Sequence, residues 1–207
     1  SDQDLIAREQ RRLLKELERW REVRLARPTL IDLFWEGEAL CWVEEPHQGA
    51  SLETLTEPLS MVEGLSLIEA VLVTLDDHHS HLELMTGEPL LHLNLHLSTI
   101  TRGQGGALLL MDPLSPSWVA LSARHMSQRI EELEGARAPE LSRGRAYPSS
   151  DLYALGMSAL AAMTGASLKR VNQRLQAERL FSQDLTLPPP AQAFLERLVS
   201  VRVSERF

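Results

Sequence analysis

Three polar side chains interrupt an apolar segment near the middle of the chain. His92, Asn94 and His96 lie within residues 89–100, and a carboxylate, Asp112, follows the next apolar run. A histidine can transfer a proton near neutral pH, and a carboxylate can hold a cation. The amide of Asn94 is a very poor base, however, and one carboxylate binds a cation only weakly. On the residues alone, a core position for His92 and a turn position for Asp112 are the simpler interpretations.

A second set of polar residues lies near the end of a long helical pattern. His78, His79 and His81 follow Asp76 and Asp77. Imidazole and carboxylate groups are ligands for zinc, but this spacing suits no tight tetrahedral pattern. Histidines at a helix end also interact favourably with the helix dipole, and this interpretation needs no metal. We therefore expect no metal site here.

The totals are those of an ordinary soluble globular protein. The chain has 207 residues, of which 43% are hydrophobic and 24% are charged, enough for one domain with a substantial core. The net charge of −8 argues against general nucleic-acid binding, and no apolar run is long enough to span a membrane. The single cysteine, Cys41, excludes an intrachain disulfide. We expect a cytoplasmic protein or a cytosolic domain of a longer one.

The first segment has a different charge balance from the rest. Residues 1–27 carry eight Arg or Lys and six Asp or Glu, against 13 and 23 in the remainder. Apolar residues recur at helical spacing, which predicts an amphipathic helix over residues 4–25. A basic contact surface is one interpretation of this helix. Because the two signs of charge are interleaved, a solvated helix with i,i+4 pairs is the simpler one.

The remaining pattern predicts one hairpin followed mostly by helices. Gly37 between two apolar runs favours the hairpin, and Pro and Gly clusters separate the later elements. We expect a hairpin at 30–43, a short helical stretch near 51–57, a buried helix at 61–80, a small hairpin around 103–106, and helices near 122–133, 151–163, 167–180 and 191–201.

The order of these elements resembles a protein kinase of the bacterial Ser/Thr type, from its regulatory helix onward. The motifs that carry the resemblance are individually weak, and only Ala138-Pro139-Glu140 is intact. The others are the hinge-like run 43–52, the catalytic-loop-like run 91–100, the Asp112-Pro113-Leu114 segment and the run 150–156, which resembles the start of the family's central helix. Several matches in the correct order carry more weight than any one of them.

The resemblance implies an α+β fold with a mainly helical C-lobe and a truncated small lobe. Residues 1–45 would form a partial N-lobe of one helix and a hairpin. Residues 46–207 would form the C-lobe, and the two parts would make one structural unit.

The same resemblance implies that catalytic residues are missing. Phosphoryl transfer needs a proton-accepting Asp, a lysine and metal ligands at fixed places. Asn94 stands at the position of that Asp, His96 replaces the loop lysine, and Thr99 replaces a metal-binding Asn. Asp112 is still an aspartate, as at the family's metal-binding position, and His92 matches the histidine that supports the loop.

The nucleotide-binding residues depart from the pattern as well. The chain contains two lysines, Lys15 and Lys169, and neither falls where the family's strand lysine would be. No Gly-rich loop precedes the first helix. Glu44 falls at the gatekeeper position, with Glu45 next to it in the hinge, where carboxylates would repel ATP. We expect no cofactor and no catalytic or metal site.

The structural positions of the family are retained. Glu140 and Arg206 match residues that form a buried ion pair between the activation segment and the helical core. Asp151 matches the aspartate that starts the central helix and binds the backbone of the catalytic loop.

The resulting hypothesis is a pseudokinase that acts as a regulatory scaffold by binding other proteins, with residues 4–25 as a candidate contact. Neither nucleic acid nor membrane insertion is expected. One alternative is an atypical nucleotide-binding protein, or a Ser/Thr kinase completed by residues upstream of Ser1. Another is an unrelated helical adaptor with accidental matches.

Overall fold

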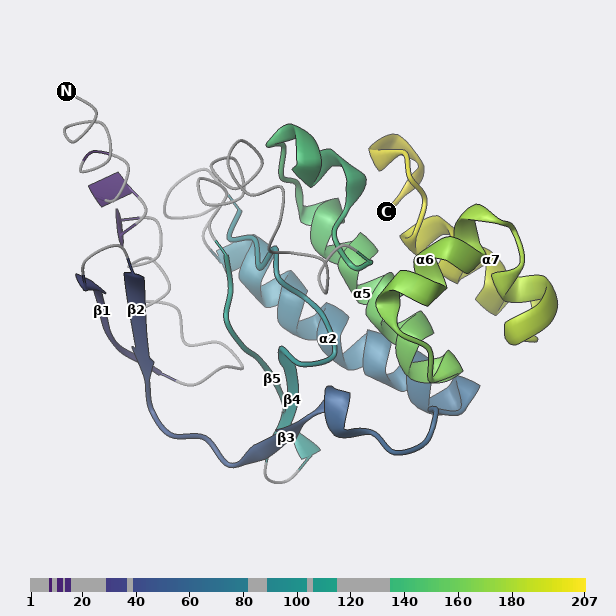
Figure 1. The fold of residues 1–207 in the computed structure, drawn as a ribbon, viewed down its shortest axis with the longest axis horizontal. Coiled ribbons are helices and arrows are strands. Elements are labelled where there is room, and N and C mark those ends of the chain that lie inside the picture. The colour runs from purple at the N-terminus through teal and green to yellow at the C-terminus, as the bar shows by residue number, and fades with distance from the viewer. Residues whose placement is uncertain are drawn as a thin grey trace.

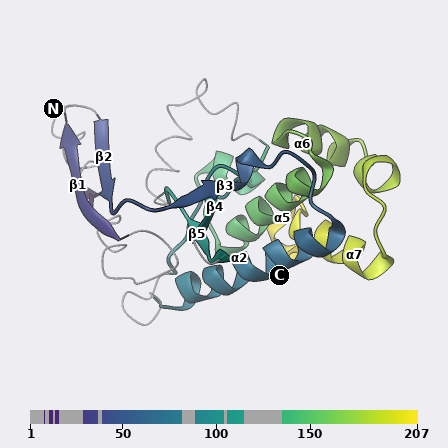
Figure 2. The same ribbon diagram turned by 90° about the horizontal axis from the view of Figure 1, so that it is seen from below.

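A two-stranded hairpin precedes the main body of the molecule. The structure is a computed structural model, which describes residues 8, 11–12, 14–15, 29–36, 39–81, 89–103, 106–114 and 135–207. Strands β1 (Leu30–Glu36) and β2 (Ala39–Glu44) pair antiparallel, with Phe34 opposite Cys41. Both views place this hairpin beside the helical body rather than within it (Figures 1 and 2). The helix predicted over 4–25 falls mostly outside the described residues.

A second, three-stranded sheet connects the segment after β2 to the middle of the chain. Its order is β3 (Gly49–Ser51), β4 (Ile100–Gly103) and β5 (Leu108–Leu110), antiparallel throughout. A side chain at Gly49 would collide with the Arg102 carbonyl, since its Cβ would lie 2.7 Å from that oxygen. The small hairpin β4–β5 was predicted from the sequence, but β3 was not.

The core is formed by two helices that lie side by side in both views (Figures 1 and 2). In α5 (Pro148–Thr164), 14 of the 17 residues are buried, which makes it the central helix. Helix α2 (Met61–His81) packs against it so closely that Gly64 has no room for a Cβ beside Met163. The prediction that this helix is buried holds for one face, because Val62 and Val73 on the other face are 66% and 62% exposed.

Shorter helices complete the described fold. A 3₁₀ helix, Pro139–Arg143, precedes α5. Helices α6 (Leu168–Gln176) and α7 (Pro189–Leu198) both pack on α5. A π-helical turn, Leu180–Asp184, joins α6 to α7, and a 3₁₀ helix, Val203–Glu205, follows α7. Prolines in the first turn of α7 are tolerated because the backbone N–H groups there need no helical partner.

Two predicted helical segments have different outcomes. Near 51–57 the helix is limited to one 3₁₀ turn, Leu52–Thr54. The helix predicted near 122–133 lies outside the described residues. Among the helices that the structure describes, none has the length and apolarity that crossing a bilayer requires.

Candidate functional site

The backbone of residues 91–99, which we call the 91–99 loop, is fixed by a carboxylate from the central helix. Asp151 lies in the first turn of α5 and is fully buried. Its two oxygens accept hydrogen bonds from the backbone N–H groups of His92, at 2.9 Å, and Leu93, at 2.6 Å. A buried carboxylate needs such donors to offset the loss of water. Asp151 therefore joins α5 to the start of the loop.

A histidine of α2 also contacts this carboxylate. His79 Nε2 lies 3.0 Å from Asp151 Oδ2, and the imidazole is 16% exposed. The sequence predicted for this histidine an interaction with the dipole at the end of its helix, and it did not predict the contact with Asp151. In the described part of the chain, no group of three or more His, Cys, Asp or Glu side chains could hold a metal ion.

Short hydrogen bonds hold Asp112 beside the 91–99 loop. After strand β5 the chain runs back along the loop, where Leu114 donates to the carbonyl of His92 at 2.8 Å. The amide Nδ2 of Asn94 donates to the carbonyl of Asp112 at 2.7 Å. Leu93 and Asp112 both have left-handed backbone conformations, with φ of 58° and 52°. Such a conformation is unusual for leucine and more common for aspartate, and strained residues of this kind cluster at functional sites.

Thr99 is used inside the loop. It is 3% exposed, and its hydroxyl lies 2.7 Å from the carbonyl oxygen of Asn94. The hydroxyl oxygen of Thr99 in turn accepts a hydrogen bond from the backbone N–H of His96 at 3.0 Å. The hydroxyl of Thr99 therefore satisfies backbone groups on both sides of the loop.

His92 and His96 have different surroundings. The His92 ring is fully buried, and its Nδ1 accepts a hydrogen bond from the backbone N–H of Asn94 at 3.3 Å. His96 is partly exposed, with Nδ1 2.7 Å from the hydroxyl of Ser98. Burial lowers the pKa of His96, although the carboxylates of Glu53 and Asp112 oppose this shift. The lowered pKa favours the neutral form of the His96 ring near pH 7.

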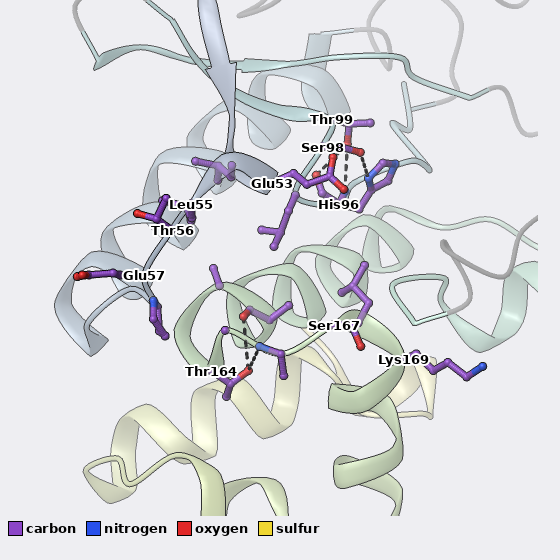
Figure 3. Close-up of a pocket in the computed structure, with 18 of the residues that line it drawn as sticks. Glu53, Leu55, Thr56, Glu57, His96, Ser98, Thr99, Thr164, Ser167 and Lys169 are labelled. Atoms are coloured by element: carbon purple, nitrogen blue, oxygen red, sulfur yellow. Dashed lines mark hydrogen bonds between the residues drawn. The ribbon is translucent and has the colours of Figure 1, made fainter.

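Part of the 91–99 loop, together with Asp112, forms one wall of a groove of about 1030 Å³. Asn94, His96, Thr99 and Asp112 all line it, so the structure brings four of the predicted positions together. The opposite walls are the segment 52–58 and the end of α5 with the start of α6. Figure 3 shows that the Lys169 side chain at the rim points away from the middle of this groove.

The other predicted positions lie elsewhere. Glu44 ends β2 and is partly buried, whereas Glu45 is exposed and donates its backbone N–H to the carbonyl of Thr29 at 2.9 Å. Neither residue lines the groove. The Glu53 carboxylate, which faces His96, was not predicted from the sequence, because a glutamate in an irregular segment carries no pattern.

Glu140 and Arg206 form a bidentate ion pair, as expected from their motif positions. The two guanidinium nitrogens lie 2.6 and 2.9 Å from the carboxylate oxygens. Ser150 also donates to Glu140, at 2.7 Å. Burial alone would raise the pKa of Glu140, but the hydrogen bonds from Arg206 and Ser150 outweigh it, so the pKa lies below its ordinary value.

Comparisons by sequence find no relative, whereas comparison of structures does. No protein-family model matches the chain, and no curated protein matches it. The kinase domain of PknI from Mycobacterium tuberculosis superposes with a TM-score of 0.68 at 22% identity, covering 95% of this chain and 73% of that domain. A double mutant of the same domain gives 0.63 at 20% identity, covering 97% and 74%.

These similarities show the fold. The chain has a protein kinase-like α+β fold, with a mainly helical main body and a reduced small lobe. At this level of identity, activity does not follow from the fold. The chemistry of the site has to be argued from its own residues.

Proposed function

We propose that this chain is a catalytically inactive kinase-like module that acts by binding other proteins. The observation that carries the proposal is the position of Thr99. At the place where the kinase resemblance puts a metal-binding amide, its buried hydroxyl is bonded to loop backbone groups. A magnesium ion placed by Asp112 would lack its second protein ligand.

Two neighbouring residues support the same proposal. Asn94 offers a neutral amide where a base is needed, and that amide is already bonded to the carbonyl of Asp112. His96 stands in place of the loop lysine, and its lowered pKa favours the uncharged form at neutral pH. Developing negative charge on a phosphoryl group would meet no cation from this loop.

The lysines do not supply a cation to the middle of this groove. Lys169, at the start of α6, points away from it (Figure 3), and Lys15, in the first segment, does not line it. We further propose residues 1–45 as a partial N-lobe and 46–207 as the C-lobe, with residues 4–25 as one candidate contact for a protein partner.

Nucleotide binding and phosphate transfer test this proposal directly. Purified protein is heated with and without ATP, in Mg²⁺ and in Mn²⁺, and is incubated with radiolabelled ATP and a mixture of protein substrates. We expect no ATP-dependent shift of the unfolding midpoint, whereas ligand at a thousandfold excess over Kd would add about 4 kcal/mol of stability. Asp112→Ala is the matched control.

The two alternatives predict different results. A nucleotide-binding regulator would show an ATP-dependent shift that Asp112→Ala removes, without transfer of phosphate. A working kinase would show transfer that the same substitution abolishes, and either result would refute the inactive module. The same assay on protein extended upstream of Ser1 tests whether preceding residues complete a kinase.

A further inference from the structure

Helix α6 begins with charges of the unfavourable sign. Its first turn contains Lys169 and Arg170 and no acidic residue, and Ser167 caps it by accepting a hydrogen bond from the N–H of Arg170 at 3.4 Å. The backbone dipoles place partial positive charge at a helix N-terminus, so anions are favoured there and cations are not. The sequence has thus placed two cations where they reduce helix stability.

Both cations face the solvent. The side chains of Lys169 and Arg170 are exposed, while Val171 between them and the next turn is fully buried. Within the described part of the chain, neither cation forms an ion pair. One turn later Arg174 adds a third positive group, which Asp184 contacts at 3.5 Å and which remains 29% exposed. Residues 169, 170 and 174 define what we call the α6 basic face.

The α6 basic face lies in the basic part of an acidic chain. Residues 29–114 carry 14 Asp or Glu and one Arg or Lys, whereas residues 135–207 carry ten basic and six acidic residues. The net negative charge of the protein repels acidic partners at long range, and a cluster of exposed cations attracts them locally. Cations that reduce helix stability and have no partner are the kind of local conflict that is expected at a functional surface.

We propose that the α6 basic face binds an acidic segment of a protein partner. A Glu or Asp side chain placed at the start of α6 would meet two cations and the positive end of the helix dipole at once. A second carboxylate one turn along would lie beside Arg174. This inference goes beyond the inactive-module proposal, since the same face would bind such a segment whether or not the chain transfers phosphate.

A double charge reversal separates binding from stability. Lys169→Glu with Arg170→Glu places anions at the N-terminus of α6, so we expect the unfolding midpoint to rise. The same variant should bind a fluorescein-labelled octaglutamate peptide at least about tenfold more weakly than the wild type, by fluorescence anisotropy in about 0.1 M salt. A gain in stability with a loss of binding excludes misfolding as the cause.

Arg102→Glu with Arg145→Glu provides the matched control, because both side chains are exposed and the variant changes the net charge equally on β4 and before α5. We expect this control to bind octaglutamate within about twofold of the wild type, since screening limits charge effects to about 10 Å at 0.1 M salt. Equal weakening in both double variants would show a non-specific response to net charge and would overturn the proposal. So would absence of octaglutamate binding by the wild type, or binding only to vesicles that contain anionic lipid.

Discussion

Removal of the Arg206 side chain should destabilise this protein strongly. Glu140 is 7% exposed in the intact protein, and Arg206→Ala leaves its carboxylate with Ser150 as the remaining side-chain donor. It also removes donors from the carbonyls of Ser149 and Ser200, which accept from the guanidinium at 3.0 and 2.7 Å. Breaking a buried pair from one side costs about 3–5 kcal/mol. For a chain of this size, that lowers the unfolding midpoint by roughly 6–20 °C.

Glu140→Ala should cost less than Arg206→Ala. Without Glu140, the guanidinium keeps its bonds to backbone carbonyls and its position 4.8 Å from the centre of the Tyr153 ring. The double variant has no orphaned charge, so its loss should be smaller than the sum of the two single losses by about 0.5–3 kcal/mol. Urea denaturation of all four proteins measures this coupling, and additive losses would refute the reasoning.

The pH dependence of stability gives an independent check. The pKa of Glu140 in the folded state lies below its ordinary value of 4.5, because the bonds from Arg206 and Ser150 outweigh burial. The ion pair therefore contributes its full stability above pH 4.5, and this contribution is lost as the pH falls through the lowered value. In Glu140→Gln this part of the acid dependence should disappear, and an unchanged pH profile would contradict the assignment.

Four further substitutions test the 91–99 loop. Asp151→Ala leaves two buried N–H groups without their acceptor, each costing about 1–3 kcal/mol, and should remove hydrogen-exchange protection at those amides. Thr99→Val keeps the side-chain shape but loses the buried hydroxyl, and should cost about 1–3 kcal/mol in urea denaturation. The pKa of His96 is lower in the folded protein than its ordinary value of 6.5, so the unfolded chain binds this proton more readily. The free energy of unfolding should therefore decrease as the pH is lowered below about 6.5, and His96→Gln should reduce this dependence. Asn94→Asp loses a donated hydrogen bond and adds a second carboxylate beside Asp112, and should cost about 1 kcal/mol, more than Asn94→Ala.

Parts of the fold with strong local patterns could be predicted from the sequence. The hairpin β1–β2, the small hairpin β4–β5 and helices α2 and α5 follow apolar periodicity and turn residues. The contact between Glu140 and Arg206 could not come from local patterns, because 66 residues separate them. It came from the order of weak motifs, which constrains contacts that are distant in sequence.

Other features gave no signal in the sequence. Strand β3 has three residues, and its pairing with β4 depends on the close approach at Gly49. The π-helical turn after α6 has no periodicity of its own. The inward orientation of Thr99 and the contact of His79 with Asp151 depend on how the loop, α2 and α5 meet, and these positions become definite only when the core has formed.

The positions that match the kinase pattern and those that depart from it differ in what a replacement would cost. Asp151, Glu140 and Arg206 are buried and each satisfies several hydrogen-bonding groups, so a change would cost several kcal/mol whatever the protein does. Asn94 lies at the groove, where a change of charge costs about 1 kcal/mol and the neutral amide is the more stable choice because it can donate to the Asp112 carbonyl. Once phosphoryl transfer is no longer required, stability alone favours Asn94 over an aspartate and the bonded Thr99 hydroxyl over a free metal ligand. On this argument Asn94 and Thr99 contribute to the stability of the 91–99 loop itself, whatever surface the proposed module uses to bind a partner.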